Sequence, residues 1–290
     1  MTVAYRATAL IREACELGEG PIYRESDGTL FFVDIDGKAL HSLRVSDGEH
    51  SHSDYGRPVC AVALTQEDLL AVIFDDEVTV MATHASEQLW TGGLDPSLRF
   101  NDAQVDPAGN LLVGTTHRDF SPGKAGLYHL VDGHLKPLRE GLGLSNGLGW
   151  SADGGELYHI DSLAQEILVA AYDPARAEIK REVRRLDVSG YSGVPDGMTV
   201  DSEGCLWIAF FGGGEVVRIT PEGKVLARVS LDTPRPTSVC LGGRGFKTMF
   251  ITTAQHPQGP AHEGGGLYSV SGMIAGRPAH RLAWRAHGSS

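Results

Sequence analysis

The sequence has no long apolar run and no cluster of basic residues. No segment approaches the roughly 18 apolar residues that a membrane helix needs, and Met1–Leu10 lacks a cationic stretch followed by an apolar one. We therefore expect neither a membrane span nor a signal peptide. The 25 Lys and Arg residues against 37 Asp and Glu give a net charge of −12, which would repel nucleic acid. These features favour a cytoplasmic protein with no nucleic-acid or membrane partner.

Paired cysteines and helical periodicity are also missing. The four cysteines are scattered and form no CxxC pair, and a chain of this length does not need disulfides, so we predict free, buried thiols. No amphipathic period near 3.6 persists for three turns. Ala175–Leu186 is helix-like in composition, but Pro174 and the β-branched residues weaken that interpretation. We expect no Gly-x-Ser-x-Gly elbow of the α/β-hydrolase kind, because the all-β pattern offers no strand-to-helix turn to support one, and so we do not expect a serine hydrolase.

Glycine, by contrast, is abundant, with 37 residues in a chain that is 41% apolar. A turn of acidic or small residues with glycine, followed by a short β-rich strand, recurs at intervals of roughly 40 to 50 residues. The first apolar residues of the six strands are Leu30, Leu69, Leu111, Leu157, Leu206 and Met249. Asp-Gly or Glu-Gly turns, such as Asp132-Gly133, lie within the units and are typical of hairpins.

Six units of this length with several short strands each predict an all-β, six-bladed β-propeller that forms a single domain over residues 1–290. A parallel β-helix would need shorter coils, and a β-sandwich does not repeat six times. The segment around Ala7–Glu13 precedes the first unit, so we expect it to complete the last blade and close the ring.

Polar residues recur about ten residues before several of these landmarks. In a propeller, the strand that precedes each landmark turn should be the innermost one, so its start lies at a mouth of the central channel. Glu19, Asn101, Asn146 and Asp196 are therefore expected to converge there. Asn-Gly and Asp-Gly pairs are common in ordinary turns. However, oxygen ligands from four blades suit a divalent cation, so we predict a metal site in the central channel.

Several motifs resemble those of the senescence-marker-protein/gluconolactonase/regucalcin family of sugar-lactone hydrolases. They occur in order over nearly the whole chain: Leu17-Gly-Glu-Gly-Pro-Ile-Tyr23, Arg99-Phe-Asn-Asp102, Ser145-Asn-Gly-Leu-Gly-Trp-Ser151 and Pro195-Asp-Gly-Met-Thr-Val-Asp201. The resemblance implies a six-bladed propeller with one catalytic divalent metal ion, whose identity (Ca²⁺, Zn²⁺, Mn²⁺, Mg²⁺ or Fe²⁺) the sequence leaves open.

The same resemblance implies roles for individual residues. Glu19, Asn146 and Asp196 match the metal ligands of the family, while Arg99 and Asn101 match its substrate-binding residues. Asp119 falls where the family has an acidic substrate contact, although the local sequence Thr116-His-Arg-Asp119 departs from the commoner pattern that contains Met.

The resulting hypothesis is a metal-dependent hydrolase that opens sugar lactones such as glucono-, xylono- or arabinono-lactone. A divalent cation can polarise the carbonyl and activate water. Asp196 is the candidate catalytic residue, as a ligand that also accepts the proton of the attacking water. The alternatives are a non-catalytic propeller that binds Ca²⁺ or a protein partner, and a propeller hydrolase that acts on other esters. The oligomeric state is not indicated by the sequence.

Overall fold

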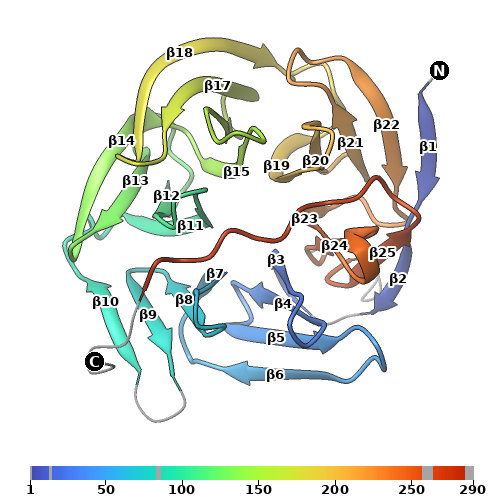
Figure 1. The fold of residues 1–290 in the computed structure, drawn as a ribbon, viewed down its shortest axis with the longest axis horizontal. Coiled ribbons are helices and arrows are strands. Elements are labelled where there is room, and N and C mark those ends of the chain that lie inside the picture. Colours follow the sequence, from blue (N-terminus) through green and yellow to red (C-terminus); the bar gives the residue numbers. More distant parts are fainter. Residues whose placement is uncertain (1, 13–14, 83–85, 257–263, 285–290) are drawn as a thin grey trace.

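The computed structural model describes residues 2–12, 15–82, 86–256 and 264–284, and within them six sheets are arranged in a ring (Figure 1). Five sheets have four strands and one has five, and almost all of the pairing is antiparallel. The helical structure within these ranges is confined to the 3₁₀ turn η1, Arg244–Phe246. None of it has the length and apolar character of a membrane crossing. The prediction of an all-β, six-bladed propeller is therefore confirmed.

Each blade is a meander whose strands run from the axis to the rim. The first blade contains β3 (Gly18–Arg24), β4 (Thr29–Asp34), β5 (Ala39–Arg44) and β6 (His50–Asp54). The second contains β7 (Val59–Leu64), β8 (Leu70–Phe74), β9 (Glu77–Met81) and β10 (Glu87–Thr91). The third contains β11 (Leu98–Val105), β12 (Leu111–His117), β13 (Ala125–Val131) and β14 (His134–Leu142).

The remaining three blades follow the same order. The fourth contains β15 (Ser145–Trp150), β16 (Glu156–Asp161), β17 (Glu166–Asp173) and β18 (Glu178–Asp187). The fifth contains β19 (Val194–Val200), β20 (Leu206–Phe211), β21 (Glu215–Ile219), β22 (Val225–Ser230) and the N-terminal strand β1 (Val3–Arg6). The sixth contains β23 (Pro236–Gly242), β24 (Thr248–Thr253), β25 (Leu267–Ser271) and β2 (Thr8–Ile11).

The N-terminal segment closes the ring, as predicted. Strand β2 pairs antiparallel with β25 and is the outermost strand of the sixth blade. Strand β1 was not predicted: it pairs in parallel with β22 and extends the fifth blade. The two N-terminal strands thus join the fifth and sixth blades.

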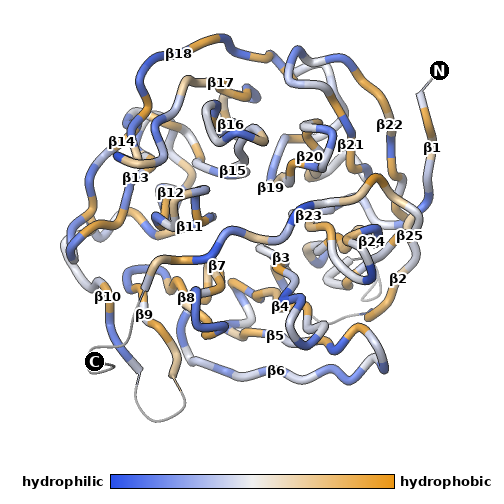
Figure 2. The backbone as a smooth tube through the Cα atoms, viewed as in Figure 1, coloured by the Kyte–Doolittle hydropathy of each residue, from blue (hydrophilic) through white to orange (hydrophobic). Residues whose placement is uncertain are grey.

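Burial decreases from the axis to the rim. All six residues of β7 are buried, whereas all five residues of β6 are exposed. The second strands of the blades, such as β8 and β20, are covered by neighbouring blades on both faces, so they carry nearly continuous apolar sequence, while rim strands face solvent (Figure 2). Trp207, in the second strand of its blade, is 1% exposed. A fully buried large apolar side chain of this kind contributes about 1.5–3 kcal/mol to stability.

The same gradient of burial explains why the stretch Ala175–Leu186 has a helix-like composition and no alternating apolar pattern although it forms a strand. It includes most of β18, a rim strand whose residues are mostly intermediate or exposed. Such a strand receives its register from its neighbour β17 and does not need an alternating apolar pattern. The prediction of free, buried thiols holds for all four cysteines.

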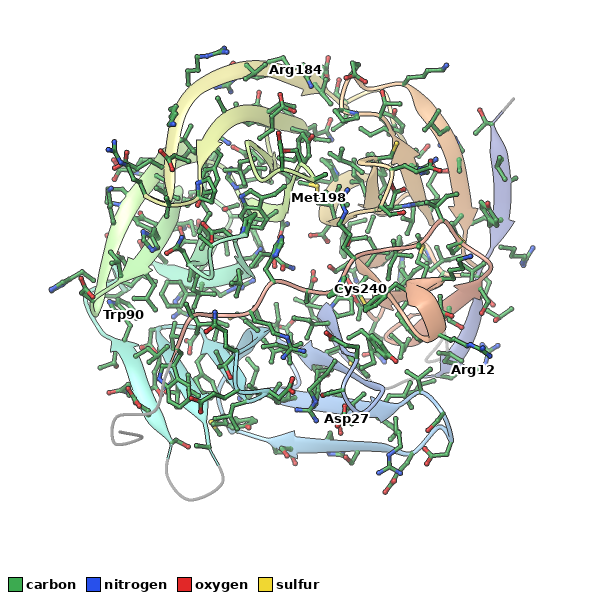
Figure 3. The ribbon with its side chains drawn as sticks, viewed as in Figure 1. Arg12, Asp27, Trp90, Arg184, Met198 and Cys240 are labelled. Atoms are coloured by element: carbon green, nitrogen blue, oxygen red, sulfur yellow. The ribbon has the colours of Figure 1, made fainter. Side chains whose placement is uncertain are left out.

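The C-terminal segment 273–284 crosses the face of the ring at the end where the innermost strands finish (Figure 1). Backbone hydrogen bonds tie it to several blades: Gly276 N–H donates to the carbonyl of Phe246, Leu282 N–H to Leu64, and Ala283 N–H to Gly109. This segment therefore covers one mouth of the channel. Met198 and Cys240, which line a small cavity beneath it, lie close to the axis in Figure 3, whereas Arg184 lies at the rim.

Candidate metal and substrate site

The larger cavity lies at the opposite mouth, where the innermost strands begin. Its volume is about 610 Å³, and its lining includes Glu19, Arg99, Asn101, Asn146 and Asp196. Five of the six residues that the sequence singled out are therefore brought together from four blades. The sixth, Asp119, is not part of the lining.

A β-bulge in every innermost strand places these side chains. The pairing between each innermost strand and its neighbour gains one extra residue, between Glu19 and Ile22 in β3, Phe100 and Ala103 in β11, Asn146 and Leu148 in β15, and Pro195 and Met198 in β19. The same shift occurs in β7 and β23. A bulge re-aims side chains out of the sheet alternation. Consequently, the candidate site residues lie in or beside the irregular part of each strand.

Three carboxylates lie deep in this part of the protein. Burial raises the pKa of Glu19 well above its usual range, and the negative charges of Asp196 and Asp102 raise it further. Burial, and to a lesser extent repulsion from Asp102, also raises the pKa of Asp196 well above its usual range. Burial also raises the pKa of Asp102 to about 6. Glu19 keeps some accessible surface because it faces the cavity. The nearby positive charge of Arg99 lowers the pKa of Glu19, but burial and the neighbouring carboxylates outweigh it.

A chain of hydrogen bonds fixes the amide groups beside these carboxylates. Arg99 Nη1 donates to Asn101 Oδ1 at 3.0 Å, and Asn101 Nδ2 donates to Asn146 Oδ1 at 2.6 Å. Asn146 Nδ2 in turn donates to Ser162 Oγ at 2.8 Å. With its nitrogen held by Ser162, Asn146 directs its oxygen toward Asn101 and the cavity. Ser162 is a positioning residue that sequence reasoning missed, because its signal was only its place directly after β16.

Two glycines allow neighbouring blades to approach closely at the site. A Cβ on Gly147 would lie 2.7 Å from the carbonyl oxygen of Asp196 and 2.6 Å from Cδ1 of Ile160. A Cβ on Gly197 would lie 2.1 Å from Ser238 Oγ. Glycine is therefore required here for packing between blades, and the close approach brings the strands that carry Asn146 and Asp196 together.

Asp119 occupies the loop after β12, outside the cavity lining. Its side chain is 70% exposed, and its carboxylate accepts hydrogen bonds from Ser121 N and Oγ and contacts His117 Nδ1. The next residue, Phe120, lines the cavity instead. The predicted substrate contact of Asp119 remains a prediction.

Ser145 and His159 form a hydrogen-bonded pair that has to be distinguished from the candidate metal and substrate site. Residues Gly143–Gly147 fit the Gly-x-Ser-x-Gly pattern, and Ser145 Oγ lies 2.8 Å from His159 Nε2. However, both residues are fully buried, and Ser145 lies within a strand. Arg139 contacts His159 Nδ1 at 2.8 Å, and burial together with this cation lowers the pKa of His159 well below its usual range. This histidine cannot readily take up a proton, so the pair is not an activated nucleophile.

A second group of potential metal ligands, Cys15, Asp34 and His41, is buried within the first and sixth blades. The carboxylate of Asp34 already accepts backbone N–H groups from Glu16, Leu17 and Gly37 at 2.8–2.9 Å. In the fourth blade, Asp161 accepts backbone N–H groups in the same way at the end of β16. Asp34 thus has a structural role that repeats between blades.

The fold and the site define a six-bladed propeller that gathers buried carboxylates and amides at one mouth of its channel. The chain belongs to the SMP-30/gluconolactonase/LRE-like family, whose model matches residues 17–255. It is 32% identical to regucalcin of Sus scrofa over 298 residues, which cover 94% of this chain and 97% of the relative. It is 36% identical over 266 residues to a protein of Bacillus subtilis (strain 168) named as a sugar lactone lactonase, YvrE, covering 88% and 90% of the two chains.

Solved structures share the fold over nearly the full chain. A luciferin-regenerating enzyme superposes with a TM-score of 0.87 at 26% identity, covering 96% of this chain and 100% of that one. Regucalcin from Agrobacterium tumefaciens str. C58, described as a calcium-binding protein, gives the same TM-score at 23% identity, covering 97% and 100%. At that identity the second comparison supports the fold alone.

Proposed function

We propose that this protein is a metal-dependent lactonase that opens sugar lactones to the corresponding acids. The observation that carries the proposal is the cluster of buried carboxylates, Glu19, Asp102 and Asp196, beside the oriented amide of Asn146 in a cavity of about 610 Å³. Like charges at such depth are costly unless a cation or protons neutralise them. Membership of the lactonase-containing family agrees with this reading.

The donor set fits a divalent cation. Glu19, Asn146 and Asp196 offer two carboxylates and one amide oxygen, and hard cations prefer such ligands. The hydrogen bond from Asn146 Nδ2 to Ser162 orients the amide so that its oxygen, which also accepts a hydrogen bond from Asn101 Nδ2, is the candidate ligand atom. When bound, a divalent cation would polarise the lactone carbonyl and lower the pKa of a water molecule.

Residues of the chain would bind the lactone and accept the proton of the attacking water. The Arg99 guanidinium and the Asn101 amide, linked by a 3.0 Å hydrogen bond, lie in the lining and would bind the polar oxygens of the lactone. Asp196 is the candidate base: its carboxylate would accept one proton from the attacking water as the new C–O bond forms. The ring C–O bond then breaks, and the released alkoxide recovers a proton.

The proposal is tested by following acid release from aldonolactones in a pH-stat, with Ca²⁺, Mg²⁺, Mn²⁺, Zn²⁺ and Fe²⁺ supplied in turn and spontaneous hydrolysis subtracted. We expect activity that chelation removes and one or more ions restore. Asp196→Asn and Asn146→Ala should lose at least a hundredfold in kcat/KM. Asp187→Asn, at an exposed position in rim strand β18, is the control. Metal uptake without turnover of any lactone would instead favour a binding protein.

A further inference from the structure

One side of the larger cavity carries polar residues that have no role in the chemistry described above. They line the cavity where the sixth blade meets the first, and we call them the polar wall: Glu16, Asp36, Arg235 and Gln255. Asp36 lies in the turn between β4 and β5, and Arg235 directly precedes β23. Glu16 lies between β2 and β3, and Gln255 follows β24. The wall is therefore assembled from segments that are far apart in sequence.

Backbone hydrogen bonds hold these segments together. Gln255 N–H donates to the carbonyl of Glu16 at 2.9 Å, and Glu16 N–H donates to the carboxylate of Asp34 at 2.8 Å. Ala254 N–H donates to the carbonyl of Arg235 at 2.9 Å. The first and sixth blades are thus joined beside the cavity, so the fold itself sets where the side chains of the polar wall begin.

The side chain of Arg235 is held by its own contacts. Its guanidinium carbon lies 4.4 Å from the centre of the Phe211 ring, and Nη1 donates to the carbonyl of Gln255. A guanidinium has several N–H groups, of which this carbonyl takes one. Burial lowers the pKa of Arg235, while the negative charge of Asp36 raises it. Asp36 is therefore near enough to act on Arg235, although these two described residues form no ion pair with each other.

The polar wall lies across the ring from Arg99. Arg99 is in β11 of the third blade, and Arg235 belongs to the sixth, which is the opposite blade in the ring (Figure 1). The candidate metal ligands come from the first, fourth and fifth blades. A lactone with its carbonyl at the metal and an oxygen bound by Arg99 would extend its far end toward Arg235. The cavity of about 610 Å³ has room for a ring with such a substituent.

From this arrangement we infer that Asp36 and Arg235 form a subsite for a hydroxyl group on the ring substituent remote from the lactone carbonyl. This inference rests on the proposed lactonase function. A hydroxyl group can donate to the carboxylate of Asp36 and accept from the guanidinium of Arg235, so it suits both groups. A carboxylate could only accept, and Asp36 and Glu16 would repel it. An alkyl group could do neither. Asp36 and Arg235 are thus assigned as determinants of substrate specificity.

The test compares three lactones that share one ring and its configuration: D-glucono-δ-lactone, its 6-deoxy analogue and D-xylono-δ-lactone. They carry a hydroxymethyl group, a methyl group and a hydrogen atom at the same ring carbon. Each is assayed in the pH-stat with the ion that best supports activity. We expect kcat/KM to be about tenfold or more higher for gluconolactone than for the 6-deoxy analogue, because a site built to bind a hydroxyl rejects an analogue that lacks it. Xylonolactone should resemble the 6-deoxy analogue.

Two substitutions remove the subsite. Arg235→Met keeps an unbranched side chain but no guanidinium, and Asp36→Ala removes an exposed carboxylate from a turn. Each should lower the ratio between gluconolactone and its 6-deoxy analogue roughly threefold or more, and the double variant should bring it near one. Asp36→Ala does not disturb the contacts of Arg235 with Phe211 and Gln255, so it tests the inference even if Arg235→Met fails to fold.

Arg244→Met is the matched control, because Arg244 is exposed and belongs to the same blade but lies in η1, beside the segment that covers the other mouth. It should retain the wild-type ratio. The inference is overturned if the wild type hydrolyses the 6-deoxy analogue as well as gluconolactone, or if the double variant keeps the wild-type ratio. In both cases lactones are still hydrolysed. If no lactone is hydrolysed with any ion, the proposed function itself fails, and the inference with it.

Discussion

Replacing Asp102 by asparagine should stabilise the protein when metal is removed. Asp102 lies beside Glu19 and Asp196 and accepts one hydrogen bond, from Ala103 N–H at 2.8 Å. Asparagine has the same shape and can keep that bond through its Oδ1. The substitution therefore removes a charge from a crowded acidic cluster while leaving the local packing nearly unchanged.

The size and sign of the effect follow from proton linkage. The pKa of Asp102 is raised from 3.8 to about 6 by burial, so the folded state holds a proton that the unfolded state has already released. Stability of the metal-free wild type should fall as the pH rises from about 4 to about 6 and then level off. The loss at pH 7 is at most about 3 kcal/mol, since a tenfold change in proton affinity is worth about 1.4 kcal/mol. Partial solvent access reduces this upper value.

The assay is thermal or chemical denaturation with a chelator at pH values from 4.5 to 8. The stability gained by Asp102→Asn over the wild type should be larger at pH 8 than at pH 4.5, and each kcal/mol should raise Tm by roughly 2–4 °C. A saturating divalent ion should favour the wild type more than the variant, because binding to the folded state adds about 2.7 kcal/mol at a hundred times Kd. Asp187→Asn is the control. A variant that is less stable at pH 8, or a gain that does not change with pH, would refute the reasoning.

Three further substitutions address other parts of the site and the ring. Gly147→Ala should destabilise the fold by about 1–3 kcal/mol, measured by denaturant unfolding, because the added methyl overlaps the neighbouring blade. Ser162→Ala should weaken metal affinity about 10–100-fold by calorimetric titration, because the Asn146 amide loses the partner that orients it. Asp201→Ala should cost about 3–5 kcal/mol, because Asp201 is fully buried and its loss removes the buried one of the two carboxylates that pair with the Arg218 guanidinium.

Each of these expectations has a clear contrary result. Unchanged unfolding of the Gly147 variant would show that the two strands can separate without cost. Wild-type metal affinity in the Ser162 variant would mean that the amide is oriented by other contacts. For Asp201, the comparison is Glu203→Ala, since Glu203 also pairs with Arg218 but is 58% exposed. Equal losses for these two substitutions would contradict the importance of burial.

The sequence was sufficient to predict the ring of six blades, but not the added strand β1 or the segment that crosses one mouth of the channel. Inner strands such as β7 and the turns between them repeat in each unit, so their number and order could be predicted. Strand β1 and segment 273–284 have no counterpart in the other units, and their hydrogen bonds join residues far apart in sequence. Local patterns carry no information about such contacts.

The convergence of Glu19, Asn101, Asn146 and Asp196 could be predicted for the same reason: equivalent places in successive blades face a common axis. The bulges could not, because no residue type marks them uniquely. The exposed side chains of Phe120 and Leu163 in the cavity lining could not be singled out individually, since single hydrophobic residues in loops are common.

The bulge repeated in all six innermost strands makes the site modular. Four blades use this position to present carboxylate or amide side chains, whereas the second and sixth have the thiol of Cys60 and the hydroxyl of Thr237 within theirs. The ring therefore holds two further directions from which a donor could reach the axis without any change to the backbone. Exchanging one side chain at either place would alter the hardness and charge of the donor set, so ion preference can evolve, or be redesigned, independently of the scaffold that carries it.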